Sequence, residues 1–297
     1  MTTSTDAQLS AVQLRRKARR QQMLQPTRIA RILVKALFSA IIIFLALFPL
    51  AWMIISGFKI RTEVVTTPFQ FFPEVWQWQN YTQILSDTSF LRTLAITGGG
   101  AVLFTIGSIT VNSMAAYAFA RLEFAGKRFV WPIVLTTMFI PGMTILLTSF
   151  IVVTNLRMLD TMAVLILPGL AGAGHIFFVR QFYLNIPSSL EEAAVVDGCG
   201  KWGVYLRIFL PLSKAPFVVV GITSFMAFWN SFVWPVMTIT SAELYQVQQY
   251  LATFRGERAS ELGLLMAGSA CAAMPIILIF LIFQRSIIAN IKMAGLK

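Results

Sequence analysis

The sequence has few charged residues and few of the residue types that most often carry catalysis. Charged residues occupy 12% of its 297 positions, against about 25% in a soluble domain. It contains one histidine and two cysteines. No segment matches G-x-x-x-x-G-K-[ST], H-E-x-x-H or G-x-S-x-G, which argues against a P-loop ATPase, a zinc hydrolase and a serine hydrolase. Cys199 and Cys271 lack metal-site spacing, and we expect neither a disulfide nor a bound metal.

Long apolar stretches are what the sequence has in abundance. Hydrophobic residues make up 57% of the chain, and the mean hydropathy is +0.73. Six stretches without a charged residue are long enough to cross a bilayer, which takes about 20 helical residues; they are 36–58, 93–120, 129–156, 161–179, 215–242 and 262–284. We therefore predict an all-α integral membrane protein with six transmembrane helices, organised as a basic tail (1–31) and a transmembrane domain (32–297).

The distribution of lysine and arginine predicts the orientation. With both termini placed in the cytoplasm, the cytoplasmic segments hold 18 of these residues and the outer loops hold 6, as the positive-inside rule requires. The net charge of +12 then reflects topology, and we expect no nucleic-acid partner. The basic cluster at 15–20 is either a positive-inside flank or a contact for anionic membrane lipid.

Few polar residues interrupt the apolar stretches. None of the six contains Asp or Glu, which argues against a proton relay and so against a proton-coupled carrier. His175 in the fourth stretch either lines a solute pathway or packs against a neighbouring helix. Trp229, Asn230 and Ser231 in the fifth stretch likewise either line a pathway or, as for Asn230, form hydrogen bonds between helices.

The segment at about 186–212 is polar and lies between two apolar stretches. Ser188 and Glu191 have the spacing of a capping box, and we predict a helix over 189–197. Leu190, Ala193 and Ala194 share one face of that helix, and Gly198 suits a left-handed position after it. A second short helix should follow and stop near Pro211. The spacing alone leaves two readings open, a docking surface or an interfacial hairpin without a partner.

The outer loop at about 240–262 is mixed in charge. Its 245–254 part is expected to form a short helix at the membrane interface. The loop either meets an external partner or serves as a plain connector.

The polar segment carries a more specific pattern. Glu192-Ala193-Ala194 is followed after three residues by Gly198, and after nine more by Ile208-x-Leu210-Pro211. This pattern resembles the EAA loop of the permease subunits of ABC importers. The stretches "FPLAWMIISGFK", "AAYAFARLEFAGKR", "FVRQFYLNIPSSLEEAAVVDG" and "WNSFVWP" resemble the MalG-like branch, which serves carbohydrate import.

The resemblance implies a type I ABC importer transmembrane domain in the bacterial inner membrane, forming half of a translocation pathway for a sugar or oligosaccharide. It implies three kinds of partner: a second permease, two copies of an ABC ATPase and an extracytoplasmic solute-binding protein. ATP and Mg would be used by the ATPase, so this chain would be neither an enzyme nor the holder of a cofactor. The loop at 240–262 corresponds in place to the loop that reaches the binding protein in maltose-type systems.

The resemblance also assigns roles within the EAA loop. Glu192 would pair with a cationic group of the ATPase, and Ala193 and Ala194 would let the helix seat closely. The residues of the predicted coupling loop are Glu191, Glu192, Ala193, Ala194, Asp197, Gly198, Ile208, Leu210 and Pro211. The alternatives are a permease for a polyol or a glycerol phosphate ester, and a secondary carrier or channel subunit that is not coupled to ATP.

Overall fold

A computed structural model describes residues 26–65, 68–254 and 261–294, and every regular element within these ranges is a helix. The chain divides into two units, 1–55 and 56–297, which are described separately. Most of the predicted basic tail (1–31) lies outside the described residues, as does the 255–260 part of the predicted outer loop.

The described part of the first unit is one long helix, α2 (Pro26–Ser56). Its large side chains, such as Ile32, Phe44 and Leu50, are apolar and exposed. A helix that is apolar on all sides is typical of a membrane span, and the 30–56 part is long and apolar enough to cross one. The predicted first span, 36–58, falls largely within it.

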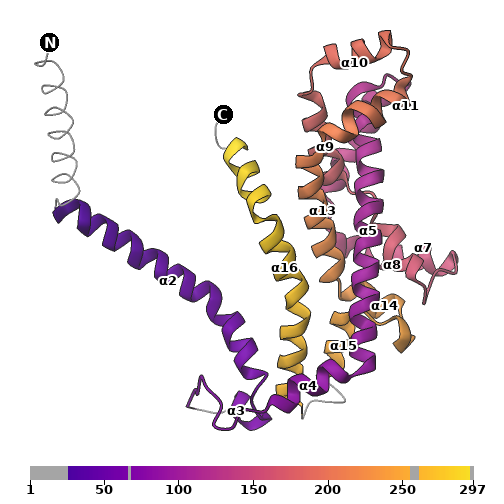
Figure 1. Cartoon of the computed structure of the whole chain (residues 1–297). Coiled ribbons are helices and arrows are strands. Elements are labelled where there is room, and N and C mark those ends of the chain that lie inside the picture. Colours follow the sequence, from indigo (N-terminus) through magenta and orange to yellow (C-terminus); the bar gives the residue numbers. More distant parts are fainter. Residues whose placement is uncertain (1–25, 66–67, 255–260, 295–297) are drawn as a thin grey trace, which may run out of the picture. The chain divides into compact units, whose positions relative to one another are not determined.

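The second unit is built around α5 (Thr88–Arg121), with α9 (Ala173–Leu184) and α13 (Lys214–Trp229) packed along it (Figure 1). Small residues permit this close packing, because a Cβ at Gly100 of α5 would lie 2.6 Å from the Phe228 ring of α13. The long helix α16 (Leu262–Ala294) packs against α13 and against the short α4 (Trp78–Ser86).

Three helices are individually long and apolar enough to cross a membrane, and three further candidates are bent pairs. The bent pairs are 127–139 with 142–155 (109°), 162–169 with 173–184 (48°), and 201–212 with 214–229 (78°). If each pair is one span, the described residues allow up to six. The predicted fifth stretch, 215–242, is not one helix, because α13 ends at Trp229 and α14 (Val233–Thr238) starts after a break.

The third and fourth apolar stretches are each broken into two helical parts. Pro141 separates two helical parts of the third stretch. The first part is α6 (Lys127–Thr136) with η1 (Thr137–Phe139), and the second is α7 (Gly142–Asn155). Ile140 before Pro141 is extended, as a residue before proline tends to be. Helix α8 (Met162–Ile166) continues into the 3-10 turn η2 (Leu167–Gly169). The regular helical hydrogen bonds then stop before α9 begins. The side chain of Asn112 on α5 binds the backbone at this break.

The Asn112 side chain is fully buried and binds the broken backbone directly. Its Nδ2 donates to the Leu170 carbonyl, and its Oδ1 accepts from the Gly172 N–H, both at 2.8 Å. Backbone groups within a membrane must be satisfied by protein. Asn112 therefore permits the break between α8 and α9.

Replacing Asn112 by leucine should lower the free energy of unfolding by roughly 1–3 kcal/mol, because it leaves the partly buried Leu170 carbonyl and Gly172 N–H without their partner. Thermal unfolding of the purified chain in detergent measures this. Thr110→Leu is the matched control, since Thr110 is exposed and its hydroxyl donates only to Ile106 of its own helix. Equal stability of the two variants would contradict the role of Asn112.

The buried core falls into two clusters, one at each end of α5. The cluster near Thr88 contains Phe90, Phe228 and Trp229, and the cluster near Arg121 contains Tyr117, Tyr183 and Phe209. The second cluster packs against the predicted EAA segment, and that segment is therefore an ordered part of the fold.

The 245–254 part of the predicted outer loop contains a short helix that packs against the rest of the unit. After η4 (Ala242–Leu244), α15 (Val247–Thr253) forms within the predicted range of 245–254, but Val247, Tyr250 and Leu251 are buried in the first cluster. The Val247 N–H donates to Thr97 Oγ1 of α5 at 2.8 Å. The predicted short helix is confirmed, and tertiary packing against α5 covers its apolar side chains.

Candidate functional site

The EAA segment forms two short helices joined by a tight turn. The first, α10, runs Ser188–Val196, and the second begins with α11 (Lys201–Val204). Gly198 lies between them at φ +80°, the left-handed position predicted for it. The Gly198 and Cys199 N–H groups donate to Val195 and Ala194 carbonyls at 3.0 and 2.9 Å. These bonds close the end of α10 and turn the chain back.

The start of α10 differs from the prediction. Pro187 precedes the first turn, no side chain caps it, and the Ser188–Glu191 capping box does not form. The Glu191 carboxylate instead accepts from Lys201 Nζ at 3.3 Å, and its side chain is only 14% exposed. Glu191 therefore holds the two helices together.

Glu192 is the acidic side chain that α10 offers outward. It is exposed and has no hydrogen-bond or ion-pair partner in the described part of the chain. Ala193 beside it is exposed, whereas Ala194 is buried in the second core cluster. Ala194 is therefore not on the outward face, where Val196 is 87% exposed.

A cavity of about 380 Å³ lies at this turn, lined by Ser188, Glu191, Glu192, Val195, Val196 and Lys201. It combines an unpaired carboxylate with apolar walls.

Polar contacts fasten the segment to the end of α5. Arg121 donates to the carbonyls of Tyr183, at 2.7 Å, and Ile186. Tyr117 Oη donates to the Lys201 carbonyl at 3.1 Å, and Ser113 Oγ lies 2.7 Å from Tyr205 Oη. Both sides of the α10–α11 turn are thus bonded to one long helix, so displacement of the turn must strain or move α5.

The remaining predicted residues of the segment have different surroundings. Asp197 is exposed at the end of α10, while Ile208 and Leu210 pack against the second cluster. They belong to the π-helical turn η3 (Tyr205–Phe209) and to α12 (Leu210–Leu212). The helix that starts at Lys201 ends at Leu212, one residue after Pro211, as predicted. The bend of 78° comes at Ser213.

The four candidate pathway residues are not brought together. Trp229 is buried, and its Nε1 donates to the Ala272 carbonyl of α16 at 3.2 Å. His175 Nε2 lies 3.0 Å from Thr223 Oγ1, joining α9 to α13. Asn230 Nδ2 donates back to Met226 of its own helix at 3.0 Å. Of the four, Ser231 lines the cavity described next.

This cavity, of about 290 Å³, lies between α7, η2, α13 and α14, close to the lower bound of roughly 300 Å³ for small-molecule sites. Its walls include Ser149, Ser231, Trp234 and Gln246. Trp234 Nε1 donates to the Val164 carbonyl at 2.9 Å, which fixes the indole ring. The cavity thus combines hydroxyls, an aromatic face and an amide.

Gln246 is the residue of this cavity that the sequence did not indicate. Its side chain is 1% exposed, and neither its Oε1 nor its Nε2 has a hydrogen-bond partner in the described residues. A buried amide without partners costs free energy. Its position before α15 gives no pattern that would distinguish it from an ordinary loop residue.

Asp160 holds the start of the 240–262 segment. Its carboxylate accepts from the Ser241 hydroxyl and from the N–H groups of Ser241 and Thr240, at 2.9 and 3.1 Å for the latter two. The Ser241 bonds, aided by that from Thr240, hold the pKa of the Asp160 carboxyl below its usual range. The charged carboxylate therefore ties this segment to the loop before α8.

Within the described residues, the structure is helical, with helices long and apolar enough to cross a membrane, three bent helix pairs and an ordered polar turn at one end of α5. Residues 108–293 match the family described as "Binding-protein-dependent transport system inner membrane component". The chain belongs to this family.

Curated relatives of the chain are permease proteins of transport systems. The arabinooligosaccharides transport system permease protein AraQ of Halalkalibacterium halodurans is 30% identical over 87% of this chain and 94% of its own length. The diacetylchitobiose uptake system permease protein NgcG of Streptomyces coelicolor is 28% identical over 82% of each chain. The sn-glycerol-3-phosphate transport system permease protein UgpE of Escherichia coli is 28% identical over 82% of this chain and 90% of its own. The chain is thus similar to ABC permease subunits, chiefly of sugar systems.

A solved structure shares the fold. A chain of a bacterial ABC transporter involved in the import of the acidic polysaccharide alginate superposes with a TM-score of 0.76, covering 88% of this chain and 98% of its own. At 20% identity this likeness speaks for the fold alone.

Proposed function

We propose that the chain is the permease subunit of an ATP-driven sugar or oligosaccharide importer, coupled to a cytoplasmic ATPase through α10. The observation that carries this proposal is the unpaired, exposed Glu192 on α10, a helix whose flanking residues Ile186 and Lys201 are bonded to α5. Family membership and the sugar permeases among the relatives support the transport class.

The coupling rests on the bonds between the EAA segment and α5. Closure of an ATPase dimer on ATP would pull α10, and α5 would move with it together with α9 and α13. Such a transition is rigid-body gating at an interface. ATP would act only through a difference in affinity between the inward and outward states. ATP and Mg belong to the partner in this scheme.

The proposed assembly has this chain in the bacterial inner membrane with six spans and both termini in the cytoplasm. A second permease completes the pathway, two ATPase copies lie beneath, and an extracytoplasmic binding protein delivers the solute to the side carrying the 240–262 segment. Sugar is favoured over a glycerol phosphate ester because the residues lining the cavity near Gln246 include no cation to bind a phosphate.

Purification of the tagged chain in mild detergent, followed by mass identification of its companions, tests the assembly. We expect a P-loop ATPase and a second multi-span subunit. ATP-dependent uptake of labelled arabinooligosaccharide, lactose or diacetylchitobiose into vesicles then tests the sugar assignment. A chain that transports one of these without any ATPase would instead be a secondary carrier.

Replacing Gln246 by leucine should reduce uptake of the transported sugar about two- to tenfold. A leucine of similar size cannot pair with a hydroxyl that enters the cavity, and one lost bond is worth about 0.5–1.5 kcal/mol. Gln248→Leu is the control, because Gln248 undergoes the same chemical change but does not line this cavity. Equal uptake by the two variants would remove Gln246 from the pathway.

A further inference from the structure

A basic cavity lies where α5 ends and α6 begins, at the same end of the unit as α10. Its volume is about 390 Å³, and it is lined by Glu123, Phe124, Gly126, Lys127, Arg128, Trp131 and Arg180. These residues come from the loop after α5, from α6 and from α9. The cavity is separate from the α10 turn and from the cavity near Gln246.

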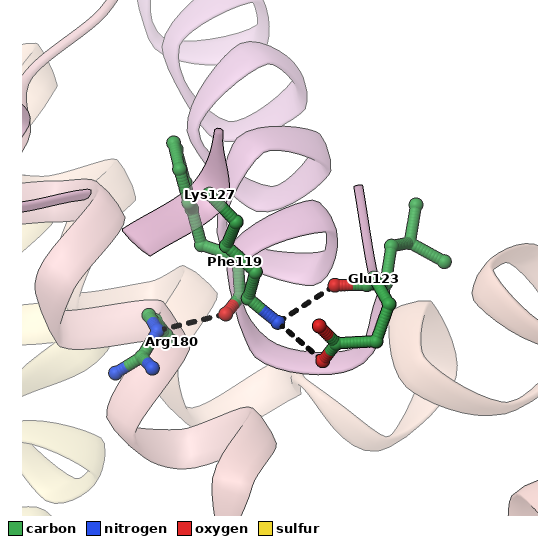
Figure 2. Close-up of polar contacts among 5 residues, drawn as sticks. Phe119, Glu123, Lys127 and Arg180 are labelled. Carbon is green, nitrogen blue, oxygen red and sulfur yellow. Dashed lines mark hydrogen bonds and ion pairs between the residues drawn. The ribbon is translucent and has the colours of Figure 1, made fainter. Parts of the chain in front are cut away.

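Arg180 is held in a defined orientation at this cavity. Its Nε donates to the Phe119 carbonyl at 3.0 Å (Figure 2), and its guanidinium lies 4.4 Å from the centre of the Trp131 ring. No group in the described part of the chain binds its two terminal nitrogens. A guanidinium fork fixed on one side and open on the other is suited to a planar or tetrahedral oxyanion.

The cavity carries more positive than negative charge. Lys127 Nζ is paired with Glu123 at 3.0 Å and also donates to the Leu122 carbonyl at 2.6 Å (Figure 2). That pair neutralises the carboxylate lining the cavity. Arg128 and Arg180 remain without an acidic partner in the described residues, since Arg128 contacts only the ring of Phe129, at 4.6 Å. Two uncompensated guanidinium groups thus face one space.

The surroundings of the cavity are apolar. Phe129, Val130 and Ile133 on α6 are 61, 42 and 63% exposed, and they lead from the cavity along a helix assigned to a span. Trp131 has the amphipathic character of residues at a membrane interface. A free anion needs no such surface, whereas acyl chains below a headgroup do.

We propose that this cavity binds the headgroup phosphate of an anionic phospholipid, with Arg180 and Arg128 bound to the phosphodiester oxygens and the acyl chains lying along α6. Basic pockets between helices at the cytoplasmic side of a membrane bind such headgroups, and arginine–phosphate pairs are bidentate and strong. The site requires neither the proposed solute nor the ATPase.

The test uses the full-length chain in nanodiscs and phosphatidylglycerol as the probe, with phosphatidylcholine as the zwitterionic comparison. Native mass spectrometry should detect phosphatidylglycerol retained by the wild type in preference to phosphatidylcholine. Arg128→Gln should weaken retention about fivefold, since each arginine near a lipid surface contributes about 1 kcal/mol. Arg180→Gln should weaken it at least as much.

Arg207→Gln is the matched control, because Arg207 is also exposed at this end but lies outside the cavity. Arg128→Gln keeps the test valid if Arg180→Gln fails to fold, since Arg128 makes no polar contact in the described residues. Equal retention of the two lipids, or equal loss in the Arg207 variant, would overturn the proposal. Displacement of the lipid when the partner subunits assemble would do the same, and would assign the cavity to a protein interface.

Discussion

Replacing Glu192 by lysine is expected to abolish uptake while the chain remains in the membrane. Glu192 is exposed and unpaired in the described residues, so the fold does not require its charge. If it pairs with a buried cation of the ATPase, losing that pair costs about 2–5 kcal/mol, and charge reversal adds repulsion. Uptake should fall at least about 30-fold, since 1.36 kcal/mol corresponds to tenfold.

Two further variants separate pairing from net charge. Glu192→Gln removes the charge without reversing it, and should retain more uptake than Glu192→Lys. Glu74→Lys changes the net charge equally at an exposed carboxylate outside the EAA segment, and should leave uptake unchanged. Uptake and membrane content are measured together by labelled sugar and immunoblot. Full uptake with Glu192→Lys would exclude α10 as the coupling helix.

Replacing Gly198 by valine is expected to have a comparable effect by another route. At φ +80° a residue with a Cβ is strained by roughly 1–2 kcal/mol, and a β-branched residue is a strong outlier there. Space is not the difficulty, because a Cβ at Gly198 would meet nothing within 4 Å. The turn should therefore reshape, which moves Glu192 relative to the bonds that fasten α11 to α5. Loss of ATP-dependent uptake with normal membrane content is the expected result.

Gly200 provides the matched control for this experiment. A Cβ there also meets nothing within 4 Å, but its φ of −70° and ψ of 167° are extended backbone that any residue adopts. Gly200→Val should therefore retain uptake. Gly198→Asn should also retain most of it, because asparagine tolerates the left-handed region. A defect of equal size in Gly198→Val and Gly200→Val would contradict the conformational argument.

The site was predictable where it depends on local pattern. The left-handed conformation of Gly198 was predicted because Gly198 directly follows an amphipathic helix, and the structure shows this residue at positive φ. Glu192, to which the resemblance assigned pairing with the ATPase, is exposed in the structure. Ala194 illustrates the limit, since the face shared with Leu190 and Ala193 does not reveal which of the three the core covers. Glu191 likewise pairs with Lys201 across the turn instead of capping its own helix.

The sequence by itself determined that the chain is helical and suited to a membrane, because its charge-free stretches have the length of a helix that crosses a bilayer, about 20 residues, and a helix satisfies its own backbone in lipid. Its EAA spacing also indicated the family. Only the tertiary structure decided where those helices break, that α15 is buried against Thr97, and that Trp229 and His175 join helices while Gln246 lines a cavity. These features depend on contacts between residues far apart in the chain, such as Asn112 with Gly172 and Arg180 with Phe119, and no local periodicity encodes such contacts.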